Sequence, residues 1–229
     1  MEKRALNFEA ALTFMFREEG WVSKYLIGFL MLLFFWLLLP FIILMGYIIA
    51  IARRSSRDQQ PTLPPWEAWG ELITDGFLYL FAVFAYTLPI YVLFACAVIG
   101  IGAIDTFSTP TGDLTPIGLA LWCLWLIVAF LFGLVSMIFL NVAVVNFVRK
   151  GTFRSFFEFG ELYRDFRDNL GRYGIVILIL AGASMLGSFL PFIGTVWSQY
   201  AVGHLYGQLA APPMHPTESP VERFPPEGV

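Results

Sequence analysis

Long uncharged runs alternate with short charged linkers along this chain of 229 residues. Each run exceeds the roughly 20 apolar residues that an α-helix needs to cross a bilayer. Backbone amides in lipid must find hydrogen-bond partners within the chain, so we expect the runs to be helices or helical hairpins. The pattern predicts an all-α, polytopic helical membrane protein with four long hydrophobic segments, at residues 25–52, 77–104, 117–148 and 173–209.

Composition points the same way. Hydrophobic residues make up 58% of the chain and charged residues 14%, whereas a soluble domain has about 25% charged residues. Residues 1–20 have an amphipathic pattern and lack the apolar core and cleavage site of a signal peptide. We therefore expect three parts: this N-terminal segment, a helical membrane domain at residues 21–210, and a proline-rich polar tail at residues 211–229.

The placement of the 14 Lys and Arg residues predicts the orientation. The linker at residues 105–116 has none, so the positive-inside rule puts it outside and puts the linkers at 53–76 and 149–172 in the cytoplasm. Four simple spans would leave both termini outside, with five of the basic residues. If the first and last runs turn back as hairpins at Pro40 and Pro191, all 14 share one side. A long kinked helix also fits the run lengths, but the charge pattern favours hairpins and cytoplasmic termini.

One phrase occurs in both basic linkers. "LPPWEAWGELITDG" begins at Leu63 and "FFEFGELYRDF" at Phe156, and each contains aromatic, two residues, aromatic, Gly-Glu-Leu, two residues and Asp. Aromatic side chains three residues apart share a helix face, and tryptophan favours the headgroup level. The phrase therefore predicts short amphipathic surface helices, the first beginning at Pro64 and Pro65, that contact membrane lipids or other subunits. The candidate interaction residues are Trp66, Trp69, Gly70, Glu71 and Asp75 in the first copy and Phe156, Phe159, Gly160, Glu161 and Asp165 in the second.

The acids of the two copies admit two interpretations. If the copies are related by pseudosymmetry, Glu71, Asp75, Glu161 and Asp165 would meet and could bind a divalent cation or carry protons. The alternative is acidic helix starts with solvated ion pairs. The ion-pair interpretation is favoured because ion carriers usually place ionisable residues inside the membrane, and no Asp, Glu, Lys or Arg lies within the four runs. His204 is a candidate haem or pigment ligand, although a histidine bonded to the backbone is the commoner case.

No catalytic residue, metal site or cofactor is predicted. The two cysteines, Cys96 and Cys123, lie inside hydrophobic runs, without the spacing of a zinc or iron–sulfur site. No basic stripe with interleaved aromatics lies outside the runs, so we expect no nucleic-acid partner.

Several stretches together look like a known family. They are "EEGWVSKYLIGFL", "LPPWEAWGELITDGF", "AYTLPIY", "FRDNLGRY" and "YAVGHLYGQL", and they resemble a family of bacterial and archaeal polytopic membrane proteins defined only as a domain of unknown function. The likeness runs from about Phe16 to Leu209, and its most specific part is Leu-Pro-x-Trp, Trp-Gly-x-Leu and Asp-Gly at residues 63–76. The resemblance implies an integral protein of a prokaryotic cytoplasmic membrane, and it carries over no activity and no site residue.

Two functions fit these observations. The first is a non-enzymatic scaffold or accessory subunit of a larger membrane complex, favoured by the lack of nucleophile motifs, phosphate loops and charged residues within the runs. The second is a small transporter or lipid-handling permease whose proline-broken helices flank a cavity. A polar cavity lined by Asn141 and Gln199 would favour transport, and a tightly packed centre would favour the scaffold.

Overall fold

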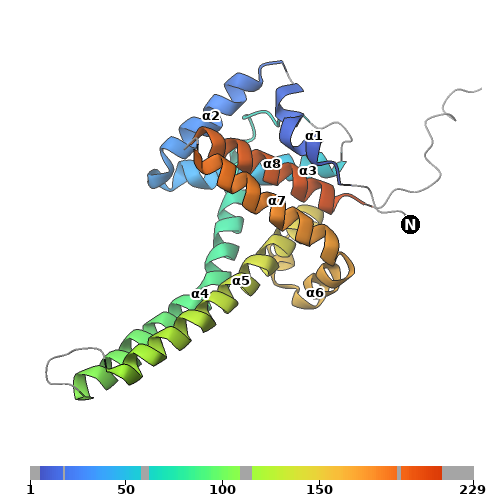
Figure 1. Ribbon diagram of the computed structural model, residues 1–229. Coiled ribbons are helices and arrows are strands. Elements are labelled where there is room, and N and C mark those ends of the chain that lie inside the picture. Colours follow the sequence, from blue (N-terminus) through green and yellow to red (C-terminus); the bar gives the residue numbers. More distant parts are fainter. Residues whose placement is uncertain (1–5, 18, 58–61, 109–114, 190–191, 213–229) are drawn as a thin grey trace, which may run out of the picture.

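The computed structural model describes residues 6–17, 19–57, 62–108, 115–189 and 192–212 (Figure 1). Every regular element in these ranges is a helix, which confirms the predicted all-α class. The elements are α1 (Phe8–Thr13), η1 (Phe14–Arg17), α2 (Trp21–Leu33), η2 (Phe35–Leu37), α3 (Leu39–Arg57), α4 (Trp69–Ser108), α5 (Pro116–Lys150), η3 (Phe153–Phe157), α6 (Phe159–Asp168), α7 (Leu170–Phe189) and α8 (Ile193–Ala210), where η denotes a 3₁₀-helix.

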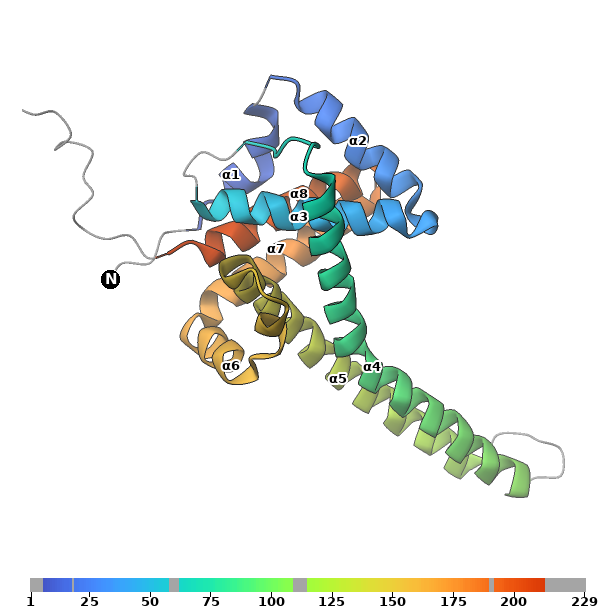
Figure 2. The same ribbon diagram turned by 180° about the vertical axis from the view of Figure 1, so that it is seen from behind.

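The molecule consists of a helix bundle and a long projecting hairpin (Figures 1 and 2). Helices α1, α2, α3, α7 and α8 form the bundle, together with the beginning of α4, the end of α5 and the short α6. The remaining parts of α4 and α5 run side by side away from it in both views. The bundle therefore holds the charged linkers, and the hairpin is built from the middle two hydrophobic runs.

The first hydrophobic run is a hairpin of α2 and α3. Its tip is the short η2, where Leu38 has a positive φ of 52°. The chain therefore turns before Pro40 and not at it, which corrects the predicted position of the break. Pro40 is the second residue of α3, where the fixed φ of proline suits a helix start and its missing N–H has no intrahelical partner to lose.

The last hydrophobic run is also divided, into α7 and α8. A Cβ added at Gly187 would lie 2.8 Å from the carbonyl oxygen of Gly194, so the two backbones nearly touch close to the turn. Phe192, with a φ of 67°, caps the start of α8. Pro191, where the turn was predicted, lies outside the described residues.

Helices α4 and α5 are much longer than a single bilayer crossing requires. They contain 40 and 35 residues, which corresponds to about 60 and 52 Å. Thr115 caps α5 by accepting a hydrogen bond from the N–H of Gly118 at 2.9 Å, and Pro116 occupies the first turn. Gly151, in the left-handed region with a φ of 70°, ends the helix by donating its N–H to the carbonyl of Phe147 at 2.8 Å.

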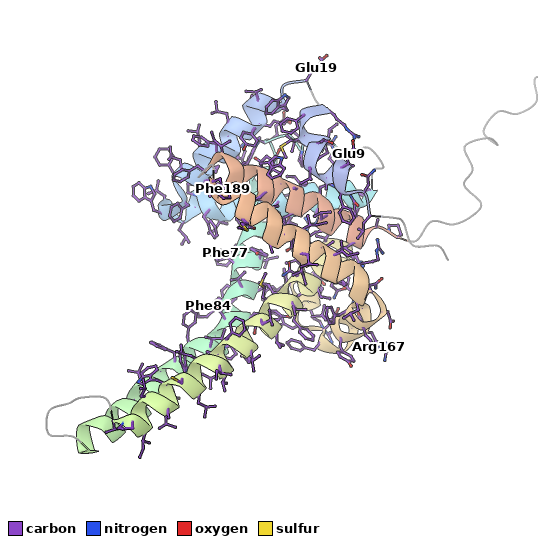
Figure 3. All side chains as sticks on the ribbon, viewed as in Figure 1. Glu9, Glu19, Phe77, Phe84, Arg167 and Phe189 are labelled. Carbon is purple, nitrogen blue, oxygen red and sulfur yellow. The ribbon has the colours of Figure 1, made fainter. Side chains whose placement is uncertain are left out.

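Burial changes sharply along the hairpin. Within α5 every residue from 141 to 148 is buried, whereas Phe130 on the same helix is 71% exposed and Ile99 on α4 is 72% exposed. Figure 3 shows Phe77 and Phe84 pointing away from α4. Apolar surface on this scale is not stable in water and is suited to lipid.

Three helices of the described chain are long and apolar enough to cross a membrane: α3, α4 and α5. Helices α2 and α7 are apolar but have shorter apolar stretches. The predicted membrane class is therefore supported, whereas the four predicted segments resolve into two long helices and two hairpins of shorter helices. The N-terminal helix α1 joins the bundle through Gln208 of α8, which bonds both the N–H and the carbonyl of Asn7 at 2.8 and 2.9 Å.

Candidate functional site

The first copy of the repeated phrase lies where the bundle passes into the hairpin. Trp69 begins α4 directly, so no separate surface helix precedes the span, and the predicted helix start at Pro64 and Pro65 is wrong. Trp66 lies in the turn before α4 and is only 7% exposed. Its ring stacks on Tyr47 of α3 at 3.8 Å with an interplanar angle of 3°.

The aromatic pair of each copy divides into one buried and one exposed ring. Trp66 and Phe156 are buried, with Phe156 stacked 4.5 Å from Phe147 of α5. Trp69 and Phe159 are 42% and 56% exposed. One ring of each copy therefore anchors its linker in the bundle, and the other is partly exposed.

The leucine of Gly-Glu-Leu is the inner anchor of each copy, and neither leucine is among the candidate residues. Leu72 is 3% exposed and Leu162 is 1% exposed, whereas the preceding Glu71 and Glu161 are exposed. Gly70 and Gly160 have no atom within 4 Å of an added Cβ, so close packing does not require glycine at either position. The signal that could have found the leucines is their position three residues beyond Trp69 and Phe159, at helical spacing in both copies.

Each aspartate of the phrase pairs with an arginine from the end of the preceding hydrophobic helix. Arg53, near the end of α3, bonds Asp75 with both terminal nitrogens, one of them at 2.9 Å. Arg149, near the end of α5, bonds Asp165 at 2.8 Å and donates its other terminal nitrogen to the carbonyl of Leu209 at 2.6 Å. Each copy of the phrase is therefore preceded by an arginine that pairs with its aspartate, near the end of α3 for the first copy and of α5 for the second. Positive charge at the end of a helix also complements the helix dipole.

Further contacts hold the second copy in place. The hydroxyl of Tyr173 donates to Asp165 at 2.6 Å. Lys150 contacts both Glu158, at 2.5 Å, and Glu161. The hydrogen bond from Lys150 holds the pKa of the Glu158 carboxyl below its usual range.

The first copy contacts the helix that precedes the second copy. The guanidinium of Arg53 lies over the ring of Phe147, 5.2 Å from its centre, which places it against the helix that carries Arg149. Asp75 and Asp165 each face an arginine. Among the residues that the structure describes, no group of three or more His, Cys, Asp or Glu side chains could hold a metal ion. Both aspartates thus form ion pairs, but the pair of Asp75, which is 7% exposed, is largely buried and not solvated.

Two polar residues of the hydrophobic runs, Asn141 and His204, have partners within the bundle. Asn141 donates to the carbonyl of Met137 at 2.7 Å and accepts from the hydroxyl of Tyr206. His204 is 3% exposed, with its ring 4.7 Å from that of Phe14 and its Nδ1 2.9 Å from the amide of Gln208. These contacts place His204 inside the packing of η1 against α8.

Comparison with known proteins identifies a family. The model of a family described as a protein of unknown function (DUF4013) matches residues 5–196. The match ends before residues 200–209. The closing stretch that contributed to the resemblance therefore lies outside the matched region. No curated protein and no solved structure matches the chain.

Proposed function

The chain belongs to the DUF4013 family of proteins of unknown function, and we propose from its geometry that it is a non-enzymatic integral membrane protein, a scaffold or accessory subunit of a larger membrane complex. The observation that supports this most is the α4–α5 hairpin, which extends beyond the bundle (Figures 1 and 2). Its outer part exposes large apolar side chains such as Ile99 and Phe130. Its partners are membrane lipids and the apolar helices of other subunits, and nucleic acid is not among them.

The packing at the centre of the bundle favours a scaffold over a transporter. The cavity lined by Gln199 has a volume of about 40 Å³, room for only a few water molecules. Its other lining residues are mainly apolar. Asn141, the second residue expected to line a transport cavity, does not line this one and is bonded to Tyr206.

Site-specific photo-crosslinking in native membranes tests the scaffold role. A photoreactive phenylalanine analogue is placed at Ile99 or Phe130 on the hairpin, with Leu178 of α7, also 72% exposed, as the matched control. We expect discrete protein adducts from the hairpin positions and predominantly lipid adducts from position 178. Lipid adducts alone at all three positions would contradict the proposal.

We assign both termini to the cytoplasmic side of a prokaryotic cytoplasmic membrane. Support comes from the two hairpins, which return the chain to the end of the bundle where Arg53, Arg149 and Arg172 lie, and from the positive-inside rule. Cysteine labelling at residue 110, in a variant that lacks Cys96 and Cys123, should succeed only from the outside. Reporter fusions at Met1 and Val229 should both report the cytoplasm, and two external reports would restore four plain spans.

A lipid-handling permease is a second candidate because of one specific feature. An apolar crevice of about 310 Å³ lies beside Pro89, between α4, α5 and η3, and aromatic residues including Tyr86, Phe157 and Phe159 line it. A crevice of this kind suits an acyl chain. Proteoliposomes with a fluorescent phosphatidylcholine and an external quencher separate the candidates, because a permease would expose the inner-leaflet label and a scaffold would leave it protected.

A further inference from the structure

A basic cleft lies beside the two arginine–aspartate pairs. Two cavities, with volumes of about 810 and 830 Å³, share Arg57, Val148 and Arg149 in their walls and so adjoin each other. Six basic side chains line the combined space, which we call the basic cleft: Arg53, Arg54, Arg57, Arg149, Lys150 and Arg172. They come from the ends of α3 and α5 and the start of α7, all at the charged end of the bundle.

The acids around the cleft do not balance these cations. Three acidic side chains, Glu71, Asp75 and Asp165, share its walls, so basic residues exceed acidic ones by three. Glu158 and Glu161 reduce the excess from outside by pairing with Lys150, and one positive charge still remains. Among the described residues that line the cleft or pair with Lys150, basic side chains therefore outnumber acidic ones.

The ion pairs orient the cations before any ligand arrives. Arg149 is fixed by Asp165 and by the carbonyl of Leu209, and Arg53 is fixed by Asp75. Arg172 lies near Arg149, and burial together with the positive charge of Arg149 lowers the pKa of Arg172. The positive charges of Arg149 and Arg172 repel each other, Asp165 offsets part of this repulsion, and a further anion would offset more of it. Planar guanidinium groups match phosphate oxygens with paired hydrogen bonds.

We propose that the basic cleft binds a phosphate anion, with the headgroup of an anionic phospholipid as its natural source. The cleft lies where α3 and α5, two of the three helices able to span the membrane, end, which is the depth of the lipid headgroups. Basic pockets between membrane helices on the cytoplasmic side bind anionic headgroups for the same electrostatic reason. A soluble phosphate compound offers the same chemistry, and the experiment separates the two sources.

The test uses the full-length protein purified in detergent. Its thermal unfolding temperature is measured against added dioleoylphosphatidylglycerol, dioleoylphosphatidylcholine or inorganic phosphate, and native mass spectrometry counts the retained lipid. We expect the anionic lipid to raise the unfolding temperature and to stay bound, with little effect from phosphatidylcholine. If inorganic phosphate stabilises the protein as much as the anionic lipid does and competes with it for binding, the cleft is still an anion site, but its natural ligand is a soluble phosphate compound.

Arg57→Gln is the decisive variant because Arg57 is exposed and ends α3, so its loss should leave the fold intact. A charge-assisted hydrogen bond contributes enough that its loss should weaken binding of the anionic lipid by about tenfold. Arg57→Lys should bind with intermediate affinity. Arg167→Gln is the matched control, since Arg167 is exposed on α6 away from the cleft lining (Figure 3). Equal responses to the two lipids, or equal binding by Arg57→Gln and Arg167→Gln, would overturn the proposal.

Discussion

Replacing Gly76 by alanine should separate α3 from α4. An added Cβ at Gly76 would lie 1.8 Å from the carbonyl oxygen of Ile42, and one at Gly46 would lie 1.9 Å from that of Leu72. An ordinary carbon–oxygen contact is about 3.3–3.6 Å, so the helices would have to move apart by about 1.5 Å at this crossing. The atoms in the way belong to the backbone, so no side-chain rotation can relieve the clash.

The expected cost follows from that movement. A gap of about 0.5–1 Å already forfeits a quarter to a half of the dispersion energy of a contact, and overpacked cores lose typically about 1–3 kcal/mol. Alanine regains about 1 kcal/mol through its helix propensity. Because the α3–α4 interface carries a large share of the bundle contacts, the loss should lie near the upper end of that range, and we expect Gly76→Ala to lower the free energy of unfolding by about 2 kcal/mol net.

Gly100→Ala is the matched control on the same helix, because an added Cβ there has no atom within 4 Å. It should be neutral or stabilising by up to about 1 kcal/mol. The free energy of unfolding of both variants is measured by titration with a denaturing detergent. In a second measurement, the protein that remains folded after heating is quantified by chromatography. Adding Gly46→Ala to Gly76→Ala should cost less than the two separate losses together, since the first substitution already separates the helices. Equal stability of Gly76→Ala and Gly100→Ala would refute the close-crossing argument.

Three further outcomes are expected. Trp66→Ala should destabilise the protein by about 3–5 kcal/mol and Trp69→Ala by clearly less, because only the first ring is buried; the same detergent titration measures both. Asp165→Asn should cost about 1–2 kcal/mol, since it weakens contacts that join α5 to α6 and α7 but are partly exposed; a matching loss in a variant without Arg149 would show that the pair is the cause. The pKa of Glu158 is lowered in the folded protein by Lys150, so its stabilising effect is present above the unfolded pKa of about 4.3 and is lost as the pH falls through the folded value. Glu158→Gln should therefore flatten the acid side of the stability profile, and an unchanged profile would contradict the contact.

The helical class follows from the sequence because long uncharged runs have no other stable structure in lipid. The ends of the helices follow less well. Pro40 is equally consistent with a helix that breaks and with one that begins, and the turn at Leu38 shows the second case. The first phrase was expected to be a helix of its own, but no residue between Trp69 and Ser108 ends α4, and the helix continues through Pro89.

The partners of the candidate residues were less predictable than the residues themselves. Spacing alone selected Asp75 and Asp165 as members of a repeat. Their arginines are 22 and 16 residues earlier in the chain and on different helices, and no local periodicity connects positions so far apart. The sequence does contain a hint, because a pair of basic residues ends the hydrophobic run before each phrase. Only the fold shows that the first member of each basic pair, Arg53 or Arg149, reaches the aspartate.

The same phrase starts two different structures, and the residue four positions after its aspartate explains the difference. In the second copy this residue is Asn169, which ends α6 with a φ of −128° and donates its side-chain amide back to the carbonyl of Asp165 at 2.9 Å. Asparagine competes with the helix through such local bonds. In the first copy the corresponding residue is Tyr79, which offers no such bond and packs against the core. The helix therefore continues into the projecting hairpin in one copy and stops after ten residues in the other. The repeated phrase thus anchors a helix start at the charged end of the bundle, and the residues that follow it decide whether the helix enters the membrane.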